Sequence, residues 1–362
     1  MRIHRVFSVL STLLLVACSG DVSNLDRAQR GTSWDRRAGW QEEDDRSRSF
    51  SFVLVGCNRV DVADVTPENP STANIEQLNR TFREVAELRP LPKLFFFVGD
   101  LVYGYNSDAS VIEDELIAWR ELYENSSLPE LGVELVAIPG NHEVQGDDRL
   151  AYLAAEEVWL RVMEPYIARG GNGPHEGGED ELSTDQSRLT YSFNYRGTHF
   201  LILNTDPVDW DWRVPVRWIQ RDLEDASAGD ARHIFALGHK PAFPWPGVPT
   251  DGLSRYPDVR DDFWSSMEKS GAEAMFAAHN HLWYKQRPDP DGTWQIIAGN
   301  GGSVLEPTFP HEDGYYGFTL VTVDQGGDVT VTSFGRDVPK EGYLCPSEQY
   351  PTTIRDTFSL NP

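Results

Sequence analysis

The stretch KLFFFVGD (residues 93–100) carries the pattern on which the fold depends: an apolar run that ends in glycine and a polar residue. Such a run predicts a buried strand, and a parallel sheet collects the polar strand ends along one edge. FSFVLVGC (50–57) and VELVAIPGN (133–141) repeat the pattern, and amphipathic helices are predicted between these strands at 74–88 and 112–123. The β-α-β-α-β order implies right-handed crossovers and a parallel sheet.

The second half of the chain is predicted to consist mainly of strands. Apolar stretches begin at Leu189 and recur up to Gly335, with a single helix predicted at about 215–226. The two halves together predict an α/β fold, a four-layer α/β/β/α sandwich of two mixed sheets flanked by helices. This domain is expected to span residues 50–335, and residues 336–362 are expected to form an extended C-terminal tail.

The first residues, MRIHRVFSVLSTLLLVACSG, have the features of an export signal, because Arg2 and Arg5 precede an apolar run too short to span a bilayer. The tetrad LVAC resembles a bacterial lipobox, which implies a lipoprotein signal peptide at 1–17 and a lipid on Cys18. The alternative is a plain secretory signal with an incidental cysteine. Residues 18–49 are expected to form a flexible acidic tether. The protein is therefore expected to be exported and lipid-anchored to a bacterial membrane, in the periplasm or at the cell surface, with the outer membrane favoured.

The charge of the chain limits the classes of partner. It has 32 basic and 57 acidic residues, which gives a net charge of −25 at pH 7. Such a surface repels phosphate backbones, so nucleic-acid binding is not expected. An anionic substrate would require local positive charge, which bound metal ions supply.

Four short motifs, GDLVY, GNHE, GHKP and AHNH, each follow an apolar stretch. Each is a weak signal by itself, but together they bring a carboxylate, a phenol, an amide and several imidazoles to the strand ends. These candidate residues are Asp100, Tyr103, Asn141, His142, His239, His279 and His281. The set suits one or two transition metal ions (Fe, Zn or Mn) with positions left open for water.

The ordered motifs resemble those of the calcineurin-like metallophosphoesterases, and GDxxY resembles the purple acid phosphatase branch. In that family two metal ions are bridged by an aspartate, which here is Asp100. The resemblance assigns Asn141, His239 and His279 to one ion, and His281 and Tyr103 to the other. It implies that His142 contacts the phosphoryl group and assists the leaving group. The implied activity is hydrolysis of a phosphate mono- or diester by metal-bound hydroxide.

The first motif of that family, Asp-x-His or Asp-x-Gly, is altered here to Cys57, Asn58 and Arg59. Cys57 is a metal-binding thiolate in one interpretation, and in another Asn58 or Asp61 supplies an oxygen instead. In a third, the second metal is weak or absent and Asn58 and Arg59 bind the substrate. In the last, Cys57 is structural, either as a buried thiol or in a disulfide with Cys345. The alteration leaves a second function open, a surface lipoprotein pseudophosphatase that binds a ligand or partner without turnover.

Overall fold

The computed structural model describes residues 49–361 except 107, 168–169, 230 and 307–313. All of these belong to the unit Gly39–Pro362. The expected signal peptide, the expected lipidation site Cys18 and nearly all of the expected tether lie outside the described residues. Among the helices of the described part, none has the length and apolar character needed to cross a bilayer.

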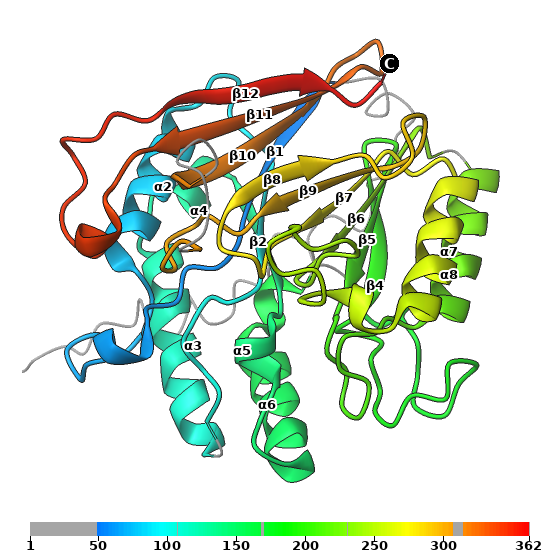
Figure 1. Cartoon of the computed structure of the whole chain (residues 1–362), viewed down its shortest axis with the longest axis horizontal. Coiled ribbons are helices and arrows are strands. Elements are labelled where there is room, and N and C mark those ends of the chain that lie inside the picture. The colour runs from blue at the N-terminus through cyan, green and yellow to red at the C-terminus, as the bar shows by residue number, and fades with distance from the viewer. Residues whose placement is uncertain (1–48, 107, 168–169, 230, 307–313, 362) are drawn as a thin grey trace, which may run out of the picture. The chain divides into compact units, whose positions relative to one another are not determined.

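The first sheet has six strands in the order β12-β11-β10-β1-β2-β3 (Figure 1). Its parallel half contains β1 (Phe50–Val55), β2 (Leu94–Val98) and β3 (Glu134–Ile138). Its antiparallel half contains β10 (Tyr316–Val323), β11 (Val329–Arg336) and β12 (Thr353–Ser359). The sheet is therefore mixed, as expected.

The second sheet also has six strands, in the order β4-β5-β6-β7-β9-β8. Four neighbours run parallel: β5 (Thr198–Leu203), β6 (His233–Gly238), β7 (Ala274–Ala277) and β9 (Trp294–Ala298). The edge strands β4 (Tyr191–Tyr195) and β8 (Trp283–Gln286) pair antiparallel with their neighbours. This sheet is mixed as well.

Phe52 of β1 holds the two sheets together. Its ring is fully buried and approaches the rings of Phe96, Phe200, Phe235 and Phe276 at centroid distances of 5.4, 5.3, 5.7 and 5.9 Å. Phe96 belongs to the same sheet, and the other three belong to the second sheet. Because buried aromatic rings contribute roughly 2–3 kcal/mol each, this cluster fixes how the sheets face each other.

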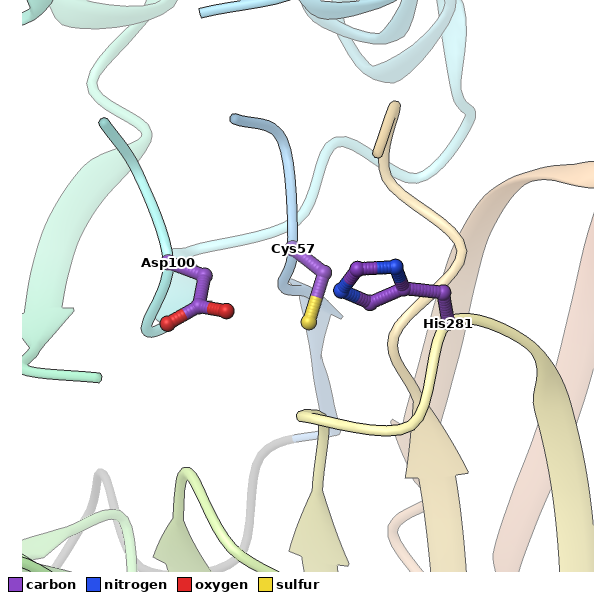
Figure 2. Close-up of side chains that lie close together, drawn as sticks. All are labelled: Cys57, Asp100 and His281. Atoms are coloured by element: carbon purple, nitrogen blue, oxygen red, sulfur yellow. The ribbon is translucent and has the colours of Figure 1, made fainter. Parts of the chain in front are cut away.

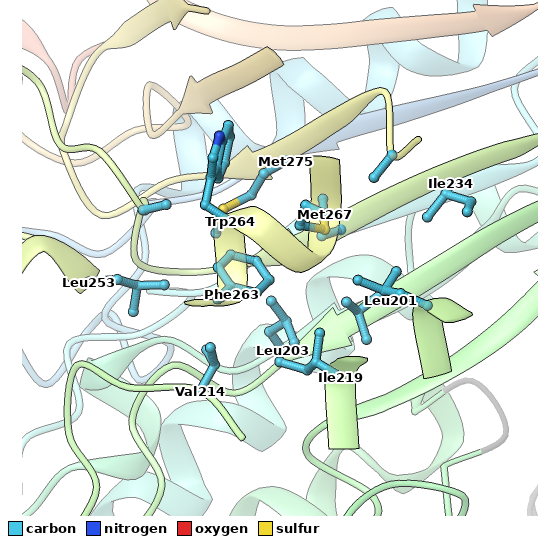
Figure 3. Packing of buried hydrophobic residues seen from close by; sticks show 14 of the residues in the cluster. Leu201, Leu203, Val214, Ile219, Ile234, Leu253, Phe263, Trp264, Met267 and Met275 are labelled. Atoms are coloured by element: carbon cyan, nitrogen blue, oxygen red, sulfur yellow. The ribbon is translucent and has the colours of Figure 1, made fainter. Parts of the chain in front are cut away.

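Helices form the outer layers. Over the first sheet, Phe95 and Phe97 of β2 pack against Phe82 of α2 (Ile75–Glu87) and Trp119 of α3 (Ala109–Glu124). Over the second sheet, α7 (Val216–Ala228) and α8 (Pro257–Lys269) bury a separate apolar cluster (Figure 3). Within the described residues, the remaining α-helices are α4 (Leu128–Leu131), α5 (Asn141–Val144) and α6 (Arg149–Val162). Short 3-10 helices lie at Val62–Asp64, Glu164–Tyr166, Leu253–Arg255 and Lys340–Gly342. The predicted four-layer α/β/β/α sandwich is confirmed.

The structure differs from the sequence-based expectation at the C-terminus. The segment 336–362 was expected to be a tail, but β12 lies within it and pairs antiparallel with β11, so the sheet continues past residue 335. The sequence of β12, TIRDTFS, has no buried apolar face that would have predicted a strand. This edge strand is held instead by its main-chain hydrogen bonds to β11. Helices α6 and α8 and strand β8 were also not predicted.

Glu156 on α6, a buried carboxyl outside the sequence motifs, is expected to make the stability of the protein depend on pH. It accepts hydrogen bonds from Gln186 Nε2 (2.8 Å) and Val208 N–H (3.4 Å), and burial raises its pKa to about 7. Since the folded pKa lies above the unfolded one, its contribution to stability is full in acid and is lost as the pH rises towards 7. We expect Glu156→Gln to be more stable than the parent at pH 8 by on the order of 3 kcal/mol, and little changed at pH 4. Urea denaturation at both pH values measures this, and equal effects at both would contradict it.

Candidate metal centre

The four sequence motifs meet at the edge where the parallel strands of both sheets end. Gly99 and Asp100 follow β2, and both have a left-handed backbone, with φ of 79° and 56°. A Cβ on Gly99 would lie 2.4 Å from His239 Nδ1 and 2.6 Å from Gly140 Cα, so only glycine lets the motif loops approach this closely. Cys57 (φ 57°) and His279 (φ 66°) share this backbone region. Such strained residues cluster at functional sites.

Asp100 belongs to two groups of possible metal ligands. In one group it lies with Cys57 and His281, and in the other with His239 and His279. In each group one ligand atom from each residue lies within 4.8 Å of the others. Asp100 Oδ1 is 3.0 Å from His239 Nε2, which in turn is 3.2 Å from His279 Nδ1. A carboxylate shared by two ligand groups is an arrangement that can hold two cations side by side.

The three histidines at the centre are each fixed in one tautomer. The ring nitrogen that points away from the centre donates to an acceptor, which leaves the other nitrogen with a lone pair that can bind a metal. These hydrogen bonds are His239 Nδ1–H to Val98 O (2.8 Å), His279 Nε2–H to Asp251 Oδ1 (3.1 Å) and His281 Nδ1–H to Val304 O (2.8 Å). Burial lowers the pKa of His279, and that of His281 to about 4. Both rings are therefore neutral near pH 7, as metal ligands must be.

At the centre, the Asp100 carboxyl and the Cys57 thiol are in different protonation states. Burial opposes ionisation of Asp100, but interactions with the imidazoles of His239 and His142 and with the Arg59 guanidinium hold its pKa well below the usual range. The Arg59 guanidinium Nε is 3.6 Å from Asp100 Oδ2. Burial raises the pKa of the Cys57 thiol well above its ordinary value. Without a cation, then, the carboxylate is charged and the thiol keeps its proton.

Asn141 presents an orphaned oxygen. The residue is 4% exposed, and its Oδ1 has no hydrogen-bond partner among the described residues. Its Nδ2 donates to Tyr105 Oη (2.7 Å), which in turn donates to Gln145 Oε1 (2.6 Å). A buried amide oxygen without a partner is costly, and a cation would satisfy it. This oxygen, the histidine lone pairs and the shared carboxylate form a donor set that fits transition metal ions.

Tyr105 is therefore expected to orient the Asn141 amide. In Tyr105→Phe the ring still packs edge-on against His142 (4.3 Å between centroids), but the amide loses the acceptor that fixes its rotation. We expect metal affinity to fall about tenfold with the fold unchanged, because groups that orient a metal ligand have effects of this size. Titration of metal-free protein measures it, with the exposed Tyr256→Phe as control. Unaltered affinity in Tyr105→Phe would contradict the assignment.

The other residues predicted for the site lie close to these ligands but make different contacts. His142 Nδ1–H donates to the Tyr103 carbonyl, and the two rings lie 5.8 Å apart, so Tyr103 adjoins the centre; its part as a ligand stays a prediction. Arg59 and His281 line a cavity of about 210 Å³, where Arg59 remains a candidate substrate contact. Asp61 Oδ1 instead caps a 3-10 helix by accepting from Ala63 N–H (3.1 Å).

Asn58 has a buried Oδ1 without a hydrogen-bond partner among the described residues, and its expected contact with substrate stays a prediction. It is fully buried, and its Nδ2 donates to the carbonyls of Asn74 (3.2 Å) and Gly301 (3.0 Å). The side chain thus ties the loop after β1 to the loop after β9. The alternative of a disulfide differs from the structure, in which Cys57 is a buried free thiol and Cys345 an exposed one.

Sequence reasoning missed the role of Glu143. Its buried carboxylate accepts hydrogen bonds from the N–H groups of Asp100 (3.0 Å), Leu101 (2.8 Å), Val102 (3.1 Å) and Gly140 (2.8 Å). It therefore holds the GDLVY turn against the GNHE turn. The sequence signal for this role is the spacing: Glu143 stands three residues after Gly140, the residue that caps the N-terminus of α5, as in a helix capping box.

Comparisons with known proteins agree with this geometry. The profile of the calcineurin-like phosphoesterases matches residues 61–302, more than half of the chain. The chain is 25% identical over 201 residues to purple acid phosphatase 15 of Arabidopsis thaliana, covering 54% of this chain and 34% of that protein. It is 23% identical over 241 residues to purple acid phosphatase 23 of the same plant, covering 59% and 47%. The chain thus spans between a third and a half of the length of these curated relatives.

A solved structure extends the likeness to the whole fold. A purple acid phosphatase from yellow lupin (Lupinus luteus) seeds overlays with a TM-score of 0.58 at 16% identity, covering 87% of this chain and 54% of that one. At this identity the overlay shows a shared fold. The resemblance seen in the sequence motifs is confirmed: the chain belongs to the calcineurin-like phosphoesterase family, a family of metal-dependent phosphoester hydrolases, and within it is similar to the purple acid phosphatases.

Proposed function

We propose that this chain hydrolyses phosphate mono- or diesters at the centre built around Asp100. The observation that supports this most directly is that one carboxylate belongs to both ligand groups. Asp100, Asn141, His239 and His279 would hold one metal ion, and Asp100 and His281 would take part in holding another. Bound there, the ions would acidify a water molecule and neutralise charge on the phosphoryl oxygens. The expected ions are Fe, Zn or Mn.

Arg59 adds a fixed positive charge beside the centre. Because its guanidinium both approaches Asp100 and lines the cavity next to His281, it is placed to attract the substrate phosphate from that side. The cavity also contains Lys340, a second cation. Asp61 and Glu306 also line this cavity, so Arg59, which lies beside Asp100, is the cation that we assign to the substrate phosphate in a protein with a net charge of −25.

His142 would move the proton that the leaving group needs. Since Nδ1–H donates to the Tyr103 carbonyl, Nε2 of the neutral ring carries a lone pair, 4.0 Å from Asp100 Oδ2. Burial lowers the pKa of His142 to about 3, so the resting ring is neutral near pH 7. Nε2 must therefore take up a proton before it passes one to the departing oxygen.

Replacing His142 with alanine is expected to slow ester hydrolysis while leaving metal binding in place. We expect kcat to fall on the order of 10²-fold, the usual contribution of a proton-transferring group, with metal content unchanged. Steady-state kinetics with aryl phosphates and metal analysis of the same samples measure this. The exposed His175→Ala, whose side chain is 70% accessible, is the control. A loss of metal in His142→Ala would instead make His142 a ligand.

The proposed function is tested by metal analysis of purified protein together with hydrolysis of aryl phosphate mono- and diesters. We expect about two equivalents of metal and turnover that stops when the metal is removed. Protein that binds metal and phosphate but hydrolyses neither ester would favour the pseudophosphatase, a protein that binds a ligand or partner without turnover. Which ester is hydrolysed faster decides the substrate class.

Export and anchoring remain part of the proposal and are supported by the LVAC tetrad that ends at Cys18. A lipid-anchored protein is expected in the membrane fraction of a bacterial expression host, outer membrane included, and Cys18→Ser is expected to move it to the soluble exported fraction. Membrane association that survives Cys18→Ser would count against the anchor.

A further inference from the structure

Cys57 is held rigidly at the end of β1. Its N–H donates to Gly99 O (2.9 Å), and its carbonyl accepts from Ser303 N–H (2.9 Å). The residue is fully buried and keeps a left-handed φ of 57°, a conformation that costs a non-glycine residue roughly 1–2 kcal/mol. This conformation directs the sulfur towards Asp100 and His281 (Figure 2).

The neighbours of the sulfur are metal-binding groups. Sγ, a carboxylate oxygen of Asp100 and a ring nitrogen of His281 all lie within 4.8 Å of one another. His281 is fixed with its proton on Nδ1, so Nε2 carries a lone pair, and Figure 2 shows that nitrogen facing the thiol. The N–H of His279 donates to Sγ at 3.1 Å, the kind of contact that a metal-bound thiolate accepts from the backbone.

We propose that Cys57 binds the metal ion on the His281 side of the centre as a thiolate, together with Asp100 and His281. The inference rests on the metal centre of the proposed function, but not on its turnover. On binding, the metal forms a bond to sulfur and the thiol proton is released to solvent. The two metal positions then differ, because one contains sulfur while the other has only the oxygen and nitrogen donors of Asp100, Asn141, His239 and His279.

This difference determines which ions each position accepts. A thiolate carries the same single negative charge as a carboxylate, so the charge of the centre is kept. Sulfur is softer, however, and favours Zn, Fe or Cd over Mn or Mg. The position with Cys57 is therefore expected to prefer the softer ion from a mixture, and the position with Asn141 to tolerate a harder one.

The test uses the full chain, freed of metal and then loaded with Co²⁺. A thiolate ligand gives a sulfur-to-cobalt charge-transfer band in the near ultraviolet, which oxygen and nitrogen ligands do not give. We expect this band in the parent and in the double control variant Cys18→Ser, Cys345→Ser, which keeps only Cys57. We expect no band in Cys57→Ser. Cys57→Asp is expected to bind Co²⁺ without the band and to bind Cd²⁺ at least about tenfold more weakly than the parent.

Two results would overturn the inference: a fully loaded, folded parent protein without the band, or a band that persists in Cys57→Ser. The first needs no variant, so poor folding of Cys57→Ser would not block the test. Circular dichroism checks the fold of each sample. A band without ester hydrolysis would remove the proposed function and keep the thiolate, whereas hydrolysis without a band would do the reverse.

Discussion

Asp100→Asn is expected to abolish hydrolysis of phosphate esters, with kcat/KM lower by on the order of 10³-fold or more. The physical reason is that the Asp100 carboxylate is common to both ligand groups, so a neutral amide weakens both metal positions at once. Metal analysis should show less than one equivalent retained after gel filtration. Kinetics with aryl phosphates measure the loss of activity.

The same substitution should leave the fold intact. Asparagine tolerates the left-handed backbone of residue 100 better than most residues, and it is close in shape to aspartate. Asp328→Asn, in an exposed turn, is the matched control and should retain both metal and activity. Full activity of Asp100→Asn with two bound metal ions would remove the basis of the proposed function.

Glu143→Ala is expected to lower the free energy of unfolding by about 3–5 kcal/mol and to disable the centre. The substitution leaves the four N–H groups of the GDLVY and GNHE turns buried without their acceptor. Each buried donor left unpaired costs about 1–3 kcal/mol, although the losses are not additive. Urea denaturation of the metal-free protein measures the loss of stability independently of any metal effect.

Two further variants separate this role from a general effect of charge. Glu143→Gln keeps one oxygen acceptor and should lose markedly less stability than Glu143→Ala. Glu157→Ala removes an exposed carboxylate on α6, whose side chain is 80% accessible, and should change stability by less than about 0.5 kcal/mol. Equal losses in Glu143→Gln and Glu143→Ala would show that charge, and not acceptance from the turns, is what matters.

The family was recognisable before the structure because its signals are local. Each buried strand appears as an uninterrupted apolar run, and each motif follows such a run within a few residues. Strand β12 escaped prediction for the opposite reason, since its exposed sequence carries no apolar pattern and only its pairing with β11 defines it. Helix α8 was missed although Phe263 and Met267 lie four residues apart on its buried face, a spacing typical of an amphipathic helix.

The sequence by itself determined the fold class, most of the strands, the order of the motifs and the candidate residues of the metal centre, because hydrophobic pattern and motif spacing are written along the chain. Only the tertiary structure decided what Cys57 faces, since His279 donates to its sulfur across 222 positions of sequence. The packing of one sheet on the other brings these two groups together. It also places the acceptors that fix the tautomers of the histidines, and it leaves the Asn141 oxygen without a hydrogen-bond partner. Distances between strand ends depend on how the buried rings around Phe52 fit together, and no local pattern encodes that fit.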